Sequence, residues 1–207
     1  MHTEKYLTLQ RRLVRLREIY LPQVFSPTGE YNDVDYEKVL AYTVLSHAEM
    51  EYYFEETALA IAQKAYNRWT RSKKASTPLL ALVAYYTGQY QALPESHDGN
   101  RSGEDINARI NKAYSEYNSQ IRVSNHGIKE KNLLGIFLPI GIEVSEFDEN
   151  MLIALNNFGS TRGRIAHSTR AGQLISPSDA LNDVNNIMTY IIDPFDSLLS
   201  AYKKSIR

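Results

Sequence analysis

The chain has 207 residues, of which 43% are hydrophobic and 23% charged, the composition of an ordinary globular protein. This length suits one well-buried domain over residues 1–207 and leaves little room for a second. The net charge of −1 excludes a general polyanion binder, so any contact with nucleic acid must come from a local patch. Cysteine is absent, which excludes disulfides, thiolate catalysis and cysteine-containing zinc sites, and fits a reducing cytoplasm.

Signals for secretion or for a membrane span are missing from the sequence. The first residues carry charges throughout and have no apolar core, unlike a secretory signal. The longest apolar-rich stretch, from Leu133 to Ile142, is about half of the ~20 residues that a membrane helix needs, and it contains Pro139. We therefore expect a cytoplasmic protein that does not bind membranes.

Hydrophobic residues repeat at helical spacing along most of the chain, and strand-like alternation is nearly missing. The clearest repeat predicts a long helix over residues 34–74 with one buried face. That face would consist of Ala41, Leu45, Ala48, Tyr52, Leu59, Ala62, Tyr66 and Trp69, interrupted by Glu55. Other helices are predicted at about residues 3–20 (within an N-terminal segment 1–30), 76–89, 102–121 and 148–157.

A second apolar stripe predicts a C-terminal helix over residues 176–206. Its members are Leu181, Val184, Met188, Ile191, Phe195, Leu198 and Tyr202. Ser176 can cap this helix, and Pro177 and Asp179 suit its first turn. Pro194 falls inside the helix and should kink it, because proline removes a backbone donor.

The stretch from Val123 to Glu146 is the hardest to assign, and a short buried helix followed by a turn fits it best. It opens the region, residues 123–170, that carries the motifs described below. Together these elements predict an all-α bundle of five to seven helices.

An unusual segment lies between Glu149 and Asp179, where the sequence has no acidic residue. This segment contains Arg162, Arg164, His167 and Arg170. Gly159 can end one helix and Ser160 can cap another, which would put Arg162 in a first turn that favours phosphate. Positions 162 and 167 differ by about 140° around a helix, so their side chains do not stack directly. An exposed, solvated basic turn is the alternative interpretation.

Arg162 and His167 resemble the signature of the HEPN superfamily, in which an arginine precedes a histidine by a few residues. The resemblance extends to three blocks that occur in family order. They are SHAEMEYYFEE (46–56), NHGIKEKNLLGIFLPIGI (125–142) and LNNFGSTRGRIAHSTR (155–170). Together these blocks look like the RiboL-PSP-type branch of HEPN.

The resemblance implies a ribonuclease that needs no metal or other cofactor and builds its site across a homodimer. His167 would act as general acid or base, and Arg162 would hold the scissile phosphate of RNA. Such a protein would be a toxin or an antiphage or stress effector, controlled by a neutralising antitoxin or regulatory partner. Gly163 departs from the pattern, because many HEPN nucleases have Asn, Asp or His directly after the arginine.

Several further residues are candidates for substrate binding or support. They are His47, Glu49, Asn125, His126, Asn157, Gly163, Arg164, Ser168 and Thr169. His47 and Glu51 can instead form a merely structural pair one turn apart. Capping or turn bonding explains Asn157, Ser168 and Thr169 equally well. For Asn125 and His126 the alternative is a buried hydrogen-bonding role. The HAEME sequence lacks the HExxH spacing of a zinc site, so no metal is expected.

Two other functions compete with the nuclease. One is a non-catalytic HEPN-like module that dimerises and binds a partner protein or nucleotide. The other is a helical adaptor that self-assembles through its C-terminal stripe. The presence of both Arg162 and His167 favours the nuclease, whereas Gly163 and the mild net charge favour the non-catalytic module.

Overall fold

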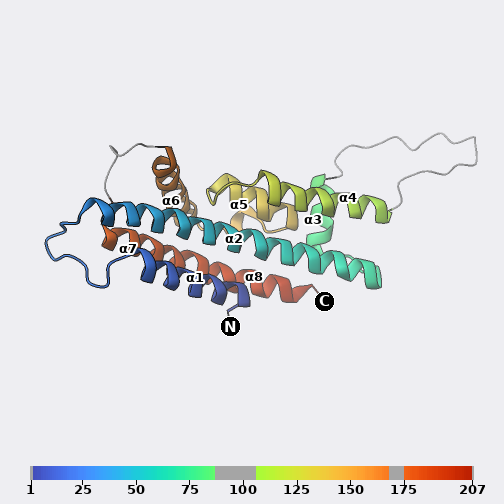
Figure 1. Ribbon diagram of the computed structural model, residues 1–207. Helices are drawn as coiled ribbons and strands as arrows, with labels where there is room; N and C mark the ends of the chain where they lie inside the picture. Colours follow the sequence, from blue (N-terminus) through green and yellow to red (C-terminus); the bar gives the residue numbers. More distant parts are fainter. Residues whose placement is uncertain (1, 87–105, 168–174, 207) are drawn as a thin grey trace, which may run out of the picture.

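The computed structural model describes residues 2–86, 106–167 and 175–206, with side chains for all of these except Ala166 and His167. Within these ranges lie the α-helices α1 (Glu4–Tyr20), α2 (Asp33–Ser72), α3 (Thr77–Tyr86), α4 (Ile106–Ser119), α5 (Glu130–Phe137), α6 (Glu149–His167), α7 (Pro177–Ile187) and α8 (Asp193–Ser205) (Figure 1). A π-helical turn, Met188–Ile192, joins α7 to α8 without a break, so the described residues form seven helical rods and no strand. The all-α bundle of five to seven helices is therefore confirmed.

The long helix α2 runs through the middle of the molecule (Figure 1). Helices α1, α7 and α8 contact α2 on one side, and α3, α4, α5 and α6 lie on the other. The Asn32 side chain caps its start by accepting the Asp35 backbone N–H at 2.9 Å, and Lys73 ends it in the left-handed conformation. This arrangement makes α2 the element that connects the two halves of the bundle.

The buried face predicted for α2 is wrong in its N-terminal half. Leu45 and Tyr52 are exposed, Tyr52 by 60%, whereas His47, Met50 and Phe54 are buried. Because neighbouring helices cover α2 from two sides, its buried surface is wider than one stripe and lies on a different part of the helix. The predicted stripe would have been correct only for a helix packed on one side.

Four phenylalanines connect α2 to the later helices. The ring of Phe137 lies 5.1 Å from that of Phe195 and 6.2 Å from that of Phe54, in edge-to-face contact. Phe147 packs on Phe195 at 5.4 Å. Such pairs add about 0.5–1.5 kcal/mol each beyond their burial, so this cluster fixes α5 and α8 against α2.

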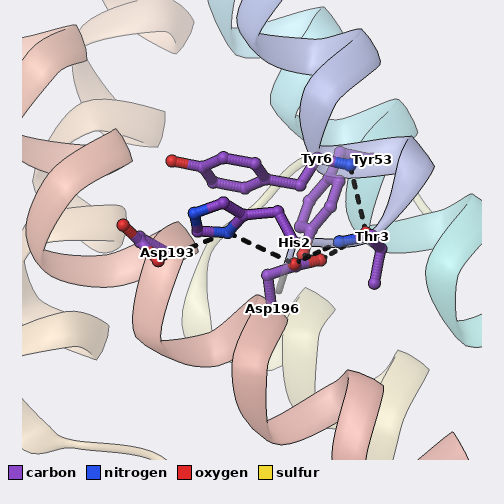
Figure 2. A network of polar contacts seen from close by, with 6 residues as sticks. All are labelled: His2, Thr3, Tyr6, Tyr53, Asp193 and Asp196. Carbon is purple, nitrogen blue, oxygen red and sulfur yellow. Dashed lines mark hydrogen bonds and ion pairs between the residues drawn. The ribbon is translucent and has the colours of Figure 1, made fainter.

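A buried carboxylate ties the N-terminal residues to α8 (Figure 2). Asp196 is fully buried and accepts hydrogen bonds from the backbone N–H and the hydroxyl of Thr3 and from the Tyr53 hydroxyl at 2.8 Å. His2 stacks on Tyr6 beside this group, with ring centroids 4.2 Å apart. Asp196 thus joins three elements, the start of α1, the middle of α2 and α8.

The two regions that the sequence predicted to be irregular, residues 123–146 and the surroundings of Pro194, form defined turns. Residues 123–146 contain α5, a short 3₁₀ turn Leu138–Ile140 and a left-handed Gly141, as expected for a short buried helix followed by a turn. The irregularity expected at Pro194 is the π-helical turn just before it, and Ser176 caps α7 by accepting the Asp179 backbone N–H. Among the described residues, every helix is too short or too polar to span a membrane.

Candidate functional site

The basic segment lies on α6, which continues unbroken from Glu149 to His167. This corrects the prediction that Gly159 ends a helix and that Ser160 begins another. Arg162 is therefore not in a first helical turn, and free backbone N–H groups do not form an anion site around it. Packing against another segment explains the glycine instead, because a Cβ on Gly159 would lie 2.9 Å from Cγ of Lys129. The aliphatic stem of Lys129 occupies that space.

Arg162 continues the inward-facing stripe of α6. The buried residues Met151, Leu155 and Phe158 recur every three or four positions, and Arg162 is the next in the series. Its side chain is half-buried. In the described part of the chain it has no hydrogen bond or ion pair. The half-buried guanidinium therefore has no counter-charge among the described residues.

The charge of Arg162 acts on His47 of α2, which is only 2% exposed. Its ring stacks on Phe158 with centroids 5.9 Å apart, and its Nδ1 lies 3.6 Å from Oε2 of Glu51. That distance is too long for a hydrogen bond, and Nδ1 has no partner among the described residues. Burial first, and then the charges of Arg162 and Lys129, lower the pKa of His47 from 6.5 to about 4. The imidazole is thus neutral at pH 7, and its approach to Glu51 is not an ion pair.

The turn before α5 is fastened to α2 by two side chains. Gly127 donates its backbone N–H to the Glu51 carboxylate, and its φ of +129° is one that other residues rarely adopt. Asn125 donates its amide N–H to Oε1 of Glu55 at 2.7 Å. Burial raises the pKa of Glu55, and the Asn125 hydrogen bond opposes that rise. Because these bonds fix the turn, the Lys129 side chain lies against α6.

Some of the residues predicted for the site lie away from this cluster. Glu49 is on another face of α2, where its carboxylate binds Arg12 of α1 at 2.8 Å. Asn157 and His126 are exposed. Arg164 is also exposed and donates to the Thr161 hydroxyl at 3.1 Å. Of the candidates, the structure brings together His47 and Arg162, with Asn125 holding the adjoining turn.

For three of the predicted residues, the structure describes no side chain. The side chain of His167 and the residues Ser168 and Thr169 lie outside the described part of the chain. Position 167 itself is the last residue of α6. Within the described ranges, no three His, Asp or Glu residues gather as a metal site would require.

Sequence reasoning missed Lys129 and Phe158, which both contribute to the surroundings of His47. Phe158 is signalled by the apolar spacing of α6. Lys129 carries no local signal, because its contact is with Gly159, thirty positions further along the chain. In the sequence, Lys129 is marked only by its position within the block 125–142.

No curated protein and no solved structure gives a significant match to this chain. The family model described as RiboL-PSP-HEPN matches residues 8–201, nearly the whole chain. The match includes all of α2 and α6, the two helices that hold His47 and Arg162. The chain belongs to the RiboL-PSP-HEPN family and contains a HEPN domain of the RiboL-PSP branch.

Proposed function

We propose that this chain is a metal-independent endoribonuclease in which Arg162 binds the scissile phosphate and His167 transfers protons. Family membership supports the activity, because HEPN domains are known for RNase activity. The observation that carries the assignment is the setting of Arg162. It is a half-buried cation without a carboxylate partner among the described residues, and it lies in a segment without acids from residue 150 to 178.

An uncompensated, half-buried guanidinium favours the binding of an anion. Removing a charge from water costs free energy unless an opposite charge or hydrogen-bond acceptors replace the lost hydration. The planar fork of arginine matches two oxygens of a phosphate. In the transition state these oxygens gain negative charge, so the same contact strengthens as the reaction proceeds.

The reaction needs one base and one acid. One histidine removes the proton of the RNA 2′-hydroxyl, and the freed oxygen forms a bond to phosphorus. The bond from phosphorus to the 5′-oxygen breaks, and a second histidine donates a proton to that oxygen. The products are a 2′,3′-cyclic phosphate and a 5′-hydroxyl. DNA stays intact because it lacks the 2′-hydroxyl.

A homodimer supplies both histidines. Positions 162 and 167 of α6 differ by about 140° around the helix axis, five steps of ~100°. Two-fold symmetry brings one His167 from each protomer to a site on the dimer axis, so the two copies can serve as base and acid. In the cell the enzyme would be a toxin or an antiphage or stress effector, with a neutralising antitoxin or another regulatory partner.

Gly163 supports a second candidate, a non-catalytic HEPN-like module that binds a partner protein or nucleotide. At this position many HEPN nucleases carry a polar side chain, and the glycine provides none. Such a module would keep the fold and the dimer without cleaving RNA.

The test is cleavage of mixed tRNA, mRNA and rRNA in EDTA by the wild type, Arg162→Ala and His167→Ala. Arg71→Ala is the charge-matched control, because Arg71 is exposed at the far end of α2. The nuclease predicts cyclic-phosphate products from the wild type and from the control alone. Full cleavage by His167→Ala would reject the assignment. If no protein cleaves, growth toxicity that depends on His167 separates a selective nuclease from the module.

A further inference from the structure

Lys129 approaches the same place as Arg162 from a different element. It is the residue directly before α5, is half-buried, and lays its stem over Gly159 of α6. The charges of Lys129 and Arg162 both act on His47. Two cations that act on one buried group repel each other, so their proximity costs free energy in the absence of an anion.

The carboxylates around these cations are already engaged. Glu51 accepts the Gly127 backbone N–H, and Glu55 accepts the Asn125 amide. Glu130, next to Lys129 in the chain, is exposed and bonded to Asn156. For Lys129, as for Arg162, no ion pair is present in the described part of the chain. An external anion could therefore bind both cations at once.

Beside these cations, the described residues leave space at Gly163. A Cβ on Gly159 would collide with the stem of Lys129, but a Cβ on Gly163, one turn further along α6, would meet no described atom within 4 Å. His47, on which both cations act, is almost fully buried, and its Nδ1 has no hydrogen-bond partner among the described residues. Two cations and a neutral polar group beside such a space suit a phosphate.

We propose that Lys129 and Arg162 together form one phosphate-binding subsite for the RNA backbone, open at Gly163 and positioned by His47 and Glu51. This rests on the proposed nuclease function and adds its second cation. Lys129 contacts the phosphate through its ammonium group. His47 and Glu51 are positioning residues, because the His47 ring packs on Phe158 of α6 and Glu51 holds the turn that carries Lys129.

The subsite is tested by binding of a short 2′-O-methyl RNA, which cannot be cleaved, across a range of salt concentrations. Lys129→Ala should weaken binding about tenfold and reduce the slope of log affinity against log salt by about 0.7, the loss of one phosphate contact to a single strand. Lys131→Ala, an exposed lysine two positions away, is the matched control and should leave both unchanged. Equal losses in both variants, or wild-type binding by Lys129→Ala, would overturn the subsite. Absence of binding by the wild type would also overturn it.

A second readout is the NMR titration of His47. Bound RNA should raise its pKa, because the phosphate offsets the two cations, and Lys129→Ala should raise it in the free protein. An unchanged titration in both cases would contradict the geometry. The nuclease and the subsite can fail separately. Lys129-dependent binding without any cleavage rejects the nuclease alone, whereas cleavage that needs Arg162 and His167 but not Lys129 rejects the subsite alone.

Discussion

His47 and Glu51 stand one turn apart on α2 with Nδ1 and Oε2 separated by 3.6 Å, yet the imidazole remains neutral. Burial and the two nearby cations outweigh the carboxylate. The carboxylate is instead used by Gly127, whose backbone N–H it accepts. This pair therefore connects α2 to both the turn before α5 and to α6, and it links the charge of the site to the stability of the fold.

His47 should make the protein less stable in acid. Its pKa is lowered from 6.5 to about 4, so between these values the unfolded chain binds a proton that the folded chain does not. The stabilisation is complete above pH 6.5 and is lost as the pH falls toward 4. From pH 7.5 to 4.5 this group should remove roughly 2–3 kcal/mol from the free energy of unfolding. Urea unfolding of the wild type and of His47→Gln at both values measures the difference, and an equal loss in both proteins would contradict the prediction.

Asp196 should be the most sensitive polar residue of the core. Asp196→Ala removes the acceptor of the buried Tyr53 hydroxyl and of the two part-buried donors of Thr3. We expect a loss of about 2–4 kcal/mol in the free energy of unfolding, because each buried unpaired group costs about 1–3 kcal/mol. Asp193→Ala, whose side chain is 41% exposed, should cost under about 1 kcal/mol. Similar losses for the two variants would show that the buried network is unimportant.

The two glycines of α6 should respond in opposite ways to alanine. Gly163→Ala has free space around it among the described residues and should raise stability by about 0.5–1 kcal/mol, the difference in helix propensity. Gly159→Ala puts a methyl group 2.9 Å from Cγ of Lys129, so the gain should be cancelled or reversed. Thermal unfolding of both variants tests this. A stabilised Gly159→Ala protein would mean that Lys129 does not lie on α6.

A shared site should make the inactive variant dominant. If each site needs His167 from both protomers, an equal mixture of wild type and His167→Ala, allowed to exchange subunits, contains about one quarter wild-type dimers. Cleavage should then fall to about a quarter of that given by the same total amount of wild type. Independent sites would retain about half. Size-exclusion chromatography of the mixture checks that the proteins are dimeric.

The sequence by itself determined the helical class, the start of α7 and the family. Ser176 followed by Pro177 and Asp179 forms a helix start through local hydrogen bonds, which need no partner elsewhere in the chain. The spacing of apolar residues likewise indicated most of the helices, because their period is a property of the local backbone. The basic, acid-free segment and its arginine were visible for the same reason.

Only the tertiary structure decided which faces are buried and which charges meet. The predicted stripe on α2 failed at Leu45 and Tyr52 because helices cover α2 on two sides, and a pattern within one helix does not record how many neighbours it has. Gly159 was interpreted as a helix end, but a lysine from another segment explains it. The neutrality of His47 likewise depends on burial and on cations from two other elements. Burial and electrostatic potential are sums over neighbours in space, and the order of residues along the chain does not specify those neighbours.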